Sequence, residues 1–189
     1  MLRPAALRDV LRAAPAHWLV TYDGDLYRSL RERDIGNATF SNPGIDHRFN
    51  RGTTRARSFS ALYASSDRTT PLFEARRRMQ TATEIIDVPG PVTRLAVLSA
   101  VVSTLLDLRK DEVCYKLKTS HQELTGNWWD YIDSRDGAPT HWLGHALHLI
   151  GNSSGIIYRS KYGTGDNIFV MHDRIGPGHV RLDHVELIN

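Results

Sequence analysis

The pattern of apolar and polar residues in the first third of the chain predicts a helix, a strand and a long loop. Apolar residues recur at helical spacing within residues 4–14, with arginines on the other face. Aromatic and β-branched residues over 18–30 predict a strand that is interrupted by a turn at Gly24. Residues 34–57 are rich in Asn, Gly, Ser, Thr and Arg, and an irregular segment of this length is typical of a functional loop.

The middle of the chain predicts a buried strand followed by a helix. The apolar run over 58–64 favours the strand, and Thr70 and Pro71 are residue types that begin helices well. Apolar positions at helical spacing continue this helix until the Pro- and Gly-containing break at 87–91. We therefore expect Glu74 in the first helical turn, where the helix dipole favours an ionised carboxylate.

The last hundred residues predict strands on both sides of one strong helix. Residues 92–102 form a β-branched run, and an apolar stripe over 141–150 indicates the helix. Three short strands are expected after it, at 155–160, 167–172 and 180–187. Since no linker or repeat divides the chain, the prediction is a single α+β domain over residues 1–189.

Composition excludes several classes of protein. With 41% hydrophobic and 24% charged residues the chain is neither disordered nor of low complexity, and its net charge of +3 does not indicate a surface built for nucleic acid. Cys114 is the only cysteine, which excludes an internal disulfide and fits a reducing compartment. The N-terminus lacks the apolar core of a signal peptide, and residues 95–108 are too short to span a bilayer. We expect a soluble, cytoplasmic protein.

Common catalytic motifs are absent from the sequence. It contains no phosphate-binding loop ending in Lys-Ser/Thr, no GxSxG, no HExxH and no paired CxxC. His141, His145 and His148 recur at helical spacing, but no carboxylate lies among them and their neighbours are typical of a core. We expect no metal site there.

Five blocks of sequence resemble the RES family, named for its Arg, Glu and Ser. In chain order they are LYRSL, HRFN, ALYASSDRTTPLFEARRR, PTHWLGHAL and GIIYRSKYGTGDNIFVMHD, and the resemblance is strongest over residues 18–172. The third block is the most specific because a strand, a turn and a helix-borne Glu74 match together. The second departs from the family's Gly-Arg-Trp-Asn, since His47 and Phe49 replace its Gly and Trp while Arg48 and Asn50 remain.

The resemblance implies an ADP-ribosyltransferase-like fold with a mixed sheet, and an enzyme that cleaves the nicotinamide–ribose bond of NAD by hydrolysis or phosphorolysis. It implies no bound cofactor and no metal, with NAD as substrate. It also implies that the chain is the toxin of a type II toxin–antitoxin pair, covered at its active site by an antitoxin with an Xre-type helix-turn-helix. Nucleic acid would be contacted only through that antitoxin, and no membrane is involved.

The matching residues suit this chemistry. Glu74 is the candidate that stabilises an oxocarbenium-like transition state, with Arg28 and Ser160 as further catalytic candidates. The substrate-binding candidates are Arg28 and Arg48 for the pyrophosphate, Tyr63 for nicotinamide or ribose, and Asn50 beside Arg48. Ser160 follows a predicted strand and suits a hydrogen bond to the ribose or to Glu74, although Ser153 and Ser154 compete for the family's serine position.

Each of these residues also has a purely structural interpretation. Tyr63 is typical of a core strand, Glu74 of a helix cap and Ser160 of a strand end, while Arg76–Arg78 are typical of a solvated helix face that an acidic antitoxin could contact. Trp128 and Trp129 are expected to be packing anchors.

Two other functions stay open at this stage. Mono-ADP-ribosylation of a protein would use the same NAD pocket. A nucleic-acid-binding module or ribonuclease is suggested by the basic clusters at 51–57 and 76–78, but the low net charge argues against it.

Overall fold

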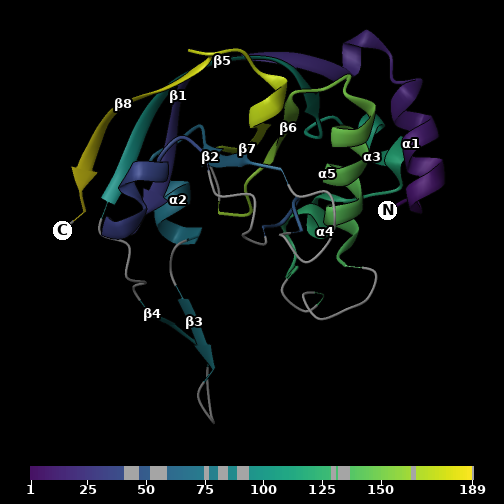
Figure 1. Ribbon diagram of the computed structural model, residues 1–189. Helices are drawn as coiled ribbons and strands as arrows, with labels where there is room; N and C mark the ends of the chain where they lie inside the picture. Colours follow the sequence, from purple (N-terminus) through teal and green to yellow (C-terminus); the bar gives the residue numbers. More distant parts are fainter. Residues whose placement is uncertain are drawn as a thin grey trace.

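The computed structural model of the chain has two crossing layers of β-strands at its centre, with helices at one end and below (Figure 1). It describes residues 1–40, 47–51, 59–74, 77–80, 85–88, 94–128, 131, 137–162 and 165–188. For Glu74 and residues 77–80 and 85–88 it describes the backbone alone.

The elements alternate between helix and strand along much of the chain. The helices are α1 (Pro4–Arg12), η1 (Ala16–Trp18), η2 (Glu32–Asn37), α2 (Thr69–Glu74), α3 (Asp111–Leu117), α4 (His121–Thr125), α5 (Pro139–Ile150) and η4 (His172–Arg174), where η marks a 3₁₀ helix. The strands are β1 (Leu19–Leu30), β2 (Ala61–Ser65), β3 (Arg77–Gln80), β4 (Ile85–Val88), β5 (Arg94–Asp107), β6 (Gly155–Arg159), β7 (Asp166–Met171) and β8 (Val180–Leu187).

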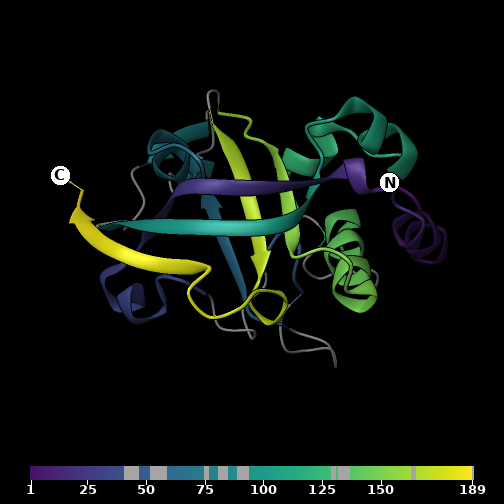
Figure 2. The ribbon, with the colours of Figure 1, turned by 90° about the horizontal axis from the view of Figure 1, so that it is seen from above.

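Six strands form one sheet that folds back on itself. β5 pairs antiparallel with β1 and β8, and β7 pairs antiparallel with β2 and β6. The end of β5 joins the two groups through parallel pairing with β6, and β1 meets β2 at Tyr27 and Ser65. Figure 2 shows the β1–β5–β8 layer crossing over the β2–β7–β6 layer.

Apolar side chains fill the space between the layers and also cover the outer face of β2, β7 and β6. Leu26 and Leu98 of the upper layer pack in one cluster with Leu62 and Ile168 of the lower layer. A second cluster joins the outer face of the lower layer to α1, α3 and α5, and Phe49 is buried in it. Removing both faces of this layer from water is what stabilises the two-layer arrangement.

Helix α5 confirms the predicted helix and shows how its ends are fixed. It begins two residues earlier than expected, with Pro139 in its first turn, where the missing N–H is not needed. The Nδ1 of His141 accepts a hydrogen bond from the Ala138 N–H at 3.0 Å. Gly151 ends the helix at a φ of +76°, a conformation that suits glycine.

The structure contradicts the predicted turn in the first strand and the predicted length of the helix after Thr70. No turn interrupts β1, because Gly24 pairs with Ala100 inside the long β1–β5 ladder, and sheet hydrogen bonds outweigh the local turn preference. The helix expected to run from 70 to the break at 87 ends at Glu74 and is followed by the β3–β4 hairpin. Arg77 and Arg78 therefore lie in a strand rather than on a helix face, and Arg76 lies outside the described residues.

The other predicted elements agree with the structure to within a few residues. The strands expected at 155–160, 167–172 and 180–187 correspond to β6, β7 and β8. The strand expected at 92–102 is β5, which continues to Asp107, and the N-terminal helix is α1. None of the helices in the described part of the chain has the length and apolarity that crossing a membrane requires.

Candidate active site

Asp67 organises the turn that joins β2 to α2. Its carboxylate accepts hydrogen bonds from the N–H groups of Thr69 and Thr70, both at 2.9 Å. The helix consequently starts at Thr69, and Thr70 is inside the helix rather than capping it. Glu74 is the last residue of this six-residue helix, so the prediction that it lies in the first turn and gains from the helix dipole is wrong.

Ser160 lies directly after β6, close to the end of α2. It is 6% exposed, its Oγ accepts the Tyr162 N–H at 3.1 Å, and its own N–H donates to the Gly165 carbonyl. The ring of Tyr162 stacks on that of Phe73, with 6.0 Å between their centroids. Because Phe73 precedes Glu74, this contact brings the segments that carry the predicted Glu and Ser together.

The competing serines lie at the opposite end of β6. The Ser153 hydroxyl donates to the Thr104 carbonyl at 2.8 Å, and Ser154 bonds the Thr104 hydroxyl at 2.9 Å. Both therefore connect β6 to β5 at the end of the strand remote from α2. This position favours Ser160 for the role that the sequence assigned to a serine.

Tyr63 projects from β2 into the apolar cluster under the lower layer. Its hydroxyl accepts the Phe49 N–H at 3.0 Å, and its ring lies 4.7 Å from that of His47 and 5.0 Å from that of Phe169, centroid to centroid. Burial raises the pKa of Tyr63 well above its usual value, although the Phe49 amide acts to lower it. The group is thus a neutral phenol whose hydroxyl can still donate one hydrogen bond.

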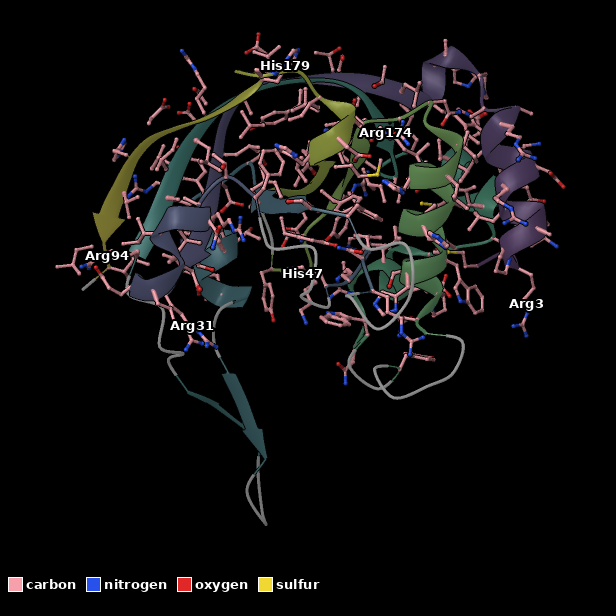
Figure 3. The ribbon with its side chains drawn as sticks, in the orientation of Figure 1. Arg3, Arg31, His47, Arg94, Arg174 and His179 are labelled. Atoms are coloured by element: carbon pink, nitrogen blue, oxygen red, sulfur yellow. The ribbon has the colours of Figure 1, made fainter. Side chains whose placement is uncertain are left out.

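The turn 47–50 holds two more of the predicted substrate ligands. Arg48 donates from Nη1 to the carbonyls of Leu124 and Gly126, at 2.9 and 2.7 Å, at the end of α4. Asn50 is 1% exposed and donates to the Phe59 carbonyl at 2.6 Å. Figure 3 labels His47 at the start of this turn, below the lower layer and on the side away from β8. The side chains of Arg48 and Asn50 therefore also hold the turn 47–50 in place.

Arg28 lies in the other layer, on β1. It follows Tyr27, the residue at which β1 meets β2, and its Nη1 donates to the carbonyls of Asn37 and Ala38 at 3.2 and 3.1 Å. Burial lowers the pKa of Arg28 to about 10, while Asp34 acts to raise it. The guanidinium is still charged at neutral pH and suits an anionic ligand.

The helical histidines have separate partners. The Nε2 of His141 bonds the His47 carbonyl at 3.0 Å, and the Nε2 of His148 bonds Asp173 at 2.9 Å. The described residues contain no group of three or more His, Cys, Asp or Glu side chains that could hold a metal ion. Trp128 packs edge-on against His141, which confirms its predicted role as a packing anchor, and Trp129 lies outside the described residues.

The structure thus brings five of the six predicted residues into two groups. Tyr63 contacts the turn 47–50 that carries Arg48 and Asn50, and the segments of Glu74 and Ser160 meet through Phe73 and Tyr162. Arg28 belongs to neither group, since its described contacts are with Asn37 and Ala38. Sequence reasoning missed Asp67, which connects the second group. Its signal was available, since an Asp followed two and three residues later by Thr, before an apolar run, is typical of a helix cap.

Comparison with known proteins gives a family and a fold. The family model of the RES domain matches residues 25–187. A chain of the crystal structure of the M. tuberculosis MbcT–MbcA toxin–antitoxin complex superimposes with a TM-score of 0.69 and 16% sequence identity, covering 99% of this chain and 93% of that chain. This likeness confirms the predicted α+β fold with a mixed sheet. No curated protein matches the chain.

Proposed function

Because the chain belongs to the RES-domain family, we propose that it is the toxin of a toxin–antitoxin pair and cleaves the nicotinamide–ribose bond of NAD. The observation that carries this proposal is the placement of Glu74 and Ser160, which lie far apart in sequence, on segments that meet through Phe73 and Tyr162. The fold shared with a chain of the MbcT–MbcA complex supports it at the level of architecture. NAD is the substrate in this proposal, and no cofactor or metal takes part.

Cleavage separates neutral nicotinamide and leaves positive charge on the ribose. A carboxylate beside the ribose stabilises that charge as it develops, which is the role of Glu74. Ser160 holds a ribose hydroxyl or orients Glu74. Water or phosphate then forms the new bond to the ribose carbon, giving ADP-ribose or its phosphate ester.

Arginines and the tyrosine bind the rest of the substrate. Arg28 and Arg48 supply charged donors for the two negative charges of the pyrophosphate. Tyr63 donates its hydroxyl hydrogen to the nicotinamide or its ribose, since its oxygen already accepts the Phe49 N–H. Asn50 contributes by holding the turn beside Arg48.

An antitoxin with an Xre-type helix-turn-helix would cover this site in the proposal and prevent NAD from entering. The substrate is an intracellular coenzyme, so the activity belongs in the cytoplasm. The second candidate is transfer of ADP-ribose to a protein, which uses the same bond cleavage with a different acceptor.

Product analysis with purified protein tests the proposal. We expect loss of NAD with release of nicotinamide, and Glu74→Gln, which keeps the side-chain volume but removes the charge, lowers the rate by about 100-fold or more. Glu112→Gln is the matched control, because Glu112 is exposed on α3 and bonds His17 and Trp18, none of which is a predicted site residue. That variant keeps the wild-type rate.

The product formed besides nicotinamide identifies the acceptor. ADP-ribose indicates hydrolysis, a phosphate-dependent product indicates phosphorolysis, and labelled protein in a cell lysate indicates ADP-ribosyl transfer. If wild-type protein leaves NAD intact under all three conditions, the proposed function is wrong.

A further inference from the structure

Asp67 accepts more hydrogen bonds than a helix cap requires. One carboxylate oxygen accepts the N–H groups of Thr69 and Thr70 and the Thr69 hydroxyl. The other accepts the hydroxyls of Ser65, at 3.1 Å, and Thr70, at 2.5 Å. These bonds connect the end of β2 to the first turn of α2, the helix that ends at Glu74.

The same carboxylate lies directly against the β6–β7 hairpin, residues 155–171. A Cβ placed on Gly165 would be 1.7 Å from the second carboxylate oxygen of Asp67, so only a glycine fits between them. Gly165 in turn accepts the Ser160 N–H through its carbonyl, at 3.1 Å. One side chain therefore spans from the helix of Glu74 to the loop of Ser160.

Backbone bonds around Asp67 reinforce this junction. The Ser66 N–H donates to the Asp166 carbonyl at 2.9 Å, and the Asp166 N–H donates to the Ser66 hydroxyl at 2.8 Å. The Asp166 carboxylate is held in turn by Arg109, at 2.7 Å, which connects the hairpin to the end of β5. The hairpin cannot shift relative to β2 without breaking several of these bonds.

We propose that Asp67 is a positioning residue for NAD cleavage: it locks α2 to the β6–β7 hairpin and so sets the distance between Glu74 and Ser160. This inference rests on the proposed function. A misplacement of about 1 Å at a catalytic group lowers a rate by about 100-fold. Asp67 accordingly acts on turnover more than on NAD binding, which the arginines carry.

A double-mutant cycle of Asp67→Ala and Gly165→Ala tests the contact between these two residues by changing each of them in turn. Each single variant lowers kcat by about 10- to 100-fold while KM for NAD changes by less than about threefold. Gly165→Ala is damaging because its methyl group meets the carboxylate. In the double variant that carboxylate is absent, so kcat is no lower than in Asp67→Ala alone, whereas independent effects would multiply.

Two further variants separate positioning from stability. Asp67→Asn keeps one acceptor oxygen, and the hydroxyls of Ser65 and Thr70 can rotate to accept its N–H groups, so it recovers most of the kcat. Leu7→Ala removes a fully buried side chain in α1, away from the site, and lowers the melting temperature without lowering kcat at a temperature where the protein is folded.

Amide hydrogen exchange gives a readout that does not depend on activity. Asp67→Ala speeds exchange in α2 and also at residues 160–162 and 165–166, whereas loss of a cap alone speeds it in α2 only. Wild-type kcat in both single variants, or faster exchange in α2 alone, would contradict the proposal that Asp67 holds α2 against the β6–β7 hairpin. If wild-type protein does not cleave NAD, the proposed function fails, and the exchange pattern still decides whether Asp67 couples the two segments.

Discussion

Asp67 shows how hydrogen bonds can hold one carboxylate in its charged form. Partial burial raises its pKa, but the bonds from Thr69, Thr70 and Ser65 outweigh this and lower it to about 2, from an ordinary value of 3.8. The folded protein therefore binds this proton less readily than the unfolded chain does. Ionised Asp67 stabilises the fold above about pH 4, and that contribution is lost as the pH falls through about 2.

Unfolding by urea between pH 7 and pH 2 checks this effect. The free energy of unfolding of wild type minus that of Asp67→Asn falls by about 1 kcal/mol as the pH is lowered from 4 to 2. This value is reduced for solvent screening. The sign follows from the depressed pKa. A difference that stays constant over this range contradicts the bonding seen at Asp67.

At the residue scale, the sequence indicates candidate residues better than it indicates the contacts that these residues make. The order of the blocks selected Arg28, Tyr63 and Glu74 as candidates, and their roles stay predictions. The contacts of Arg48 with the end of α4 were not predictable, because its partners are carbonyls more than seventy residues away and carbonyls carry no sequence signal. Asp67 has a local capping signal, but nothing near it in the sequence indicates its contact with Gly165.

At the scale of elements, helix α5 approaches the turn 47–50 closely enough to require a glycine. A Cβ on Gly144 would be 1.9 Å from the Phe49 carbonyl oxygen. The turn that carries Arg48 therefore lies directly on the helix backbone. Gly144 is the position at which the fit of the two elements depends on one residue.

We predict that Gly144→Ala destabilises the protein by about 3 kcal/mol or more. The steric conflict exceeds the gain of about 1 kcal/mol that alanine has over glycine inside a helix. Urea unfolding measures the change. The matched control is Gly36→Ala, since no atom lies within 4 Å of a Cβ built there, and its effect is within about 0.5 kcal/mol. Equal stability of the two variants would contradict the close contact.

Elements with one strong signal were predictable from sequence, and elements with competing signals were not. α5 has an apolar stripe, a proline at its start and a glycine at its end, all of which agree. The segment after Glu74 has apolar positions that fit a helix, yet Ile85, Ile86 and Val88 also suit a strand, and the hairpin forms. Gly24 favours a turn locally, but β5 is a strand of 14 residues, and Gly24 pairs with Ala100 within it.

At the scale of the whole molecule, the site depends on strand pairings that no local pattern specifies. One of the places where the layers meet is the pair Tyr27–Ser65, which joins the strand of Arg28 to the strand that leads into the turn of Asp67. The fold class followed from counting elements, whereas the crossing of the layers depends on contacts between distant segments. Only the family resemblance pointed to that arrangement in advance.

Binding of NAD should stabilise the whole domain, because its proposed ligands come from both layers. In Glu74→Gln, which slows turnover, NAD at about 100 times its Kd adds about 2.7 kcal/mol to the free energy of unfolding. For a chain of 189 residues this raises the Tm by about 5–10 °C. Thermal unfolding with and without NAD measures the shift, and Arg28→Gln reduces it. Absence of any shift at saturating NAD would contradict the proposed site.

The pairing of β2 with β7 also has a consequence for the timing of synthesis. Ser65 pairs with Asn167, a separation of 167 − 65 = 102 residues, and Ser160 lies just before β7. A ribosome adds about 5–20 residues per second, so the lower layer stays open for several seconds after β2 has been made. The nascent chain therefore has no complete candidate site until β7 has left the ribosome, and in the proposed function this interval allows a newly made antitoxin to be present before NAD cleavage begins.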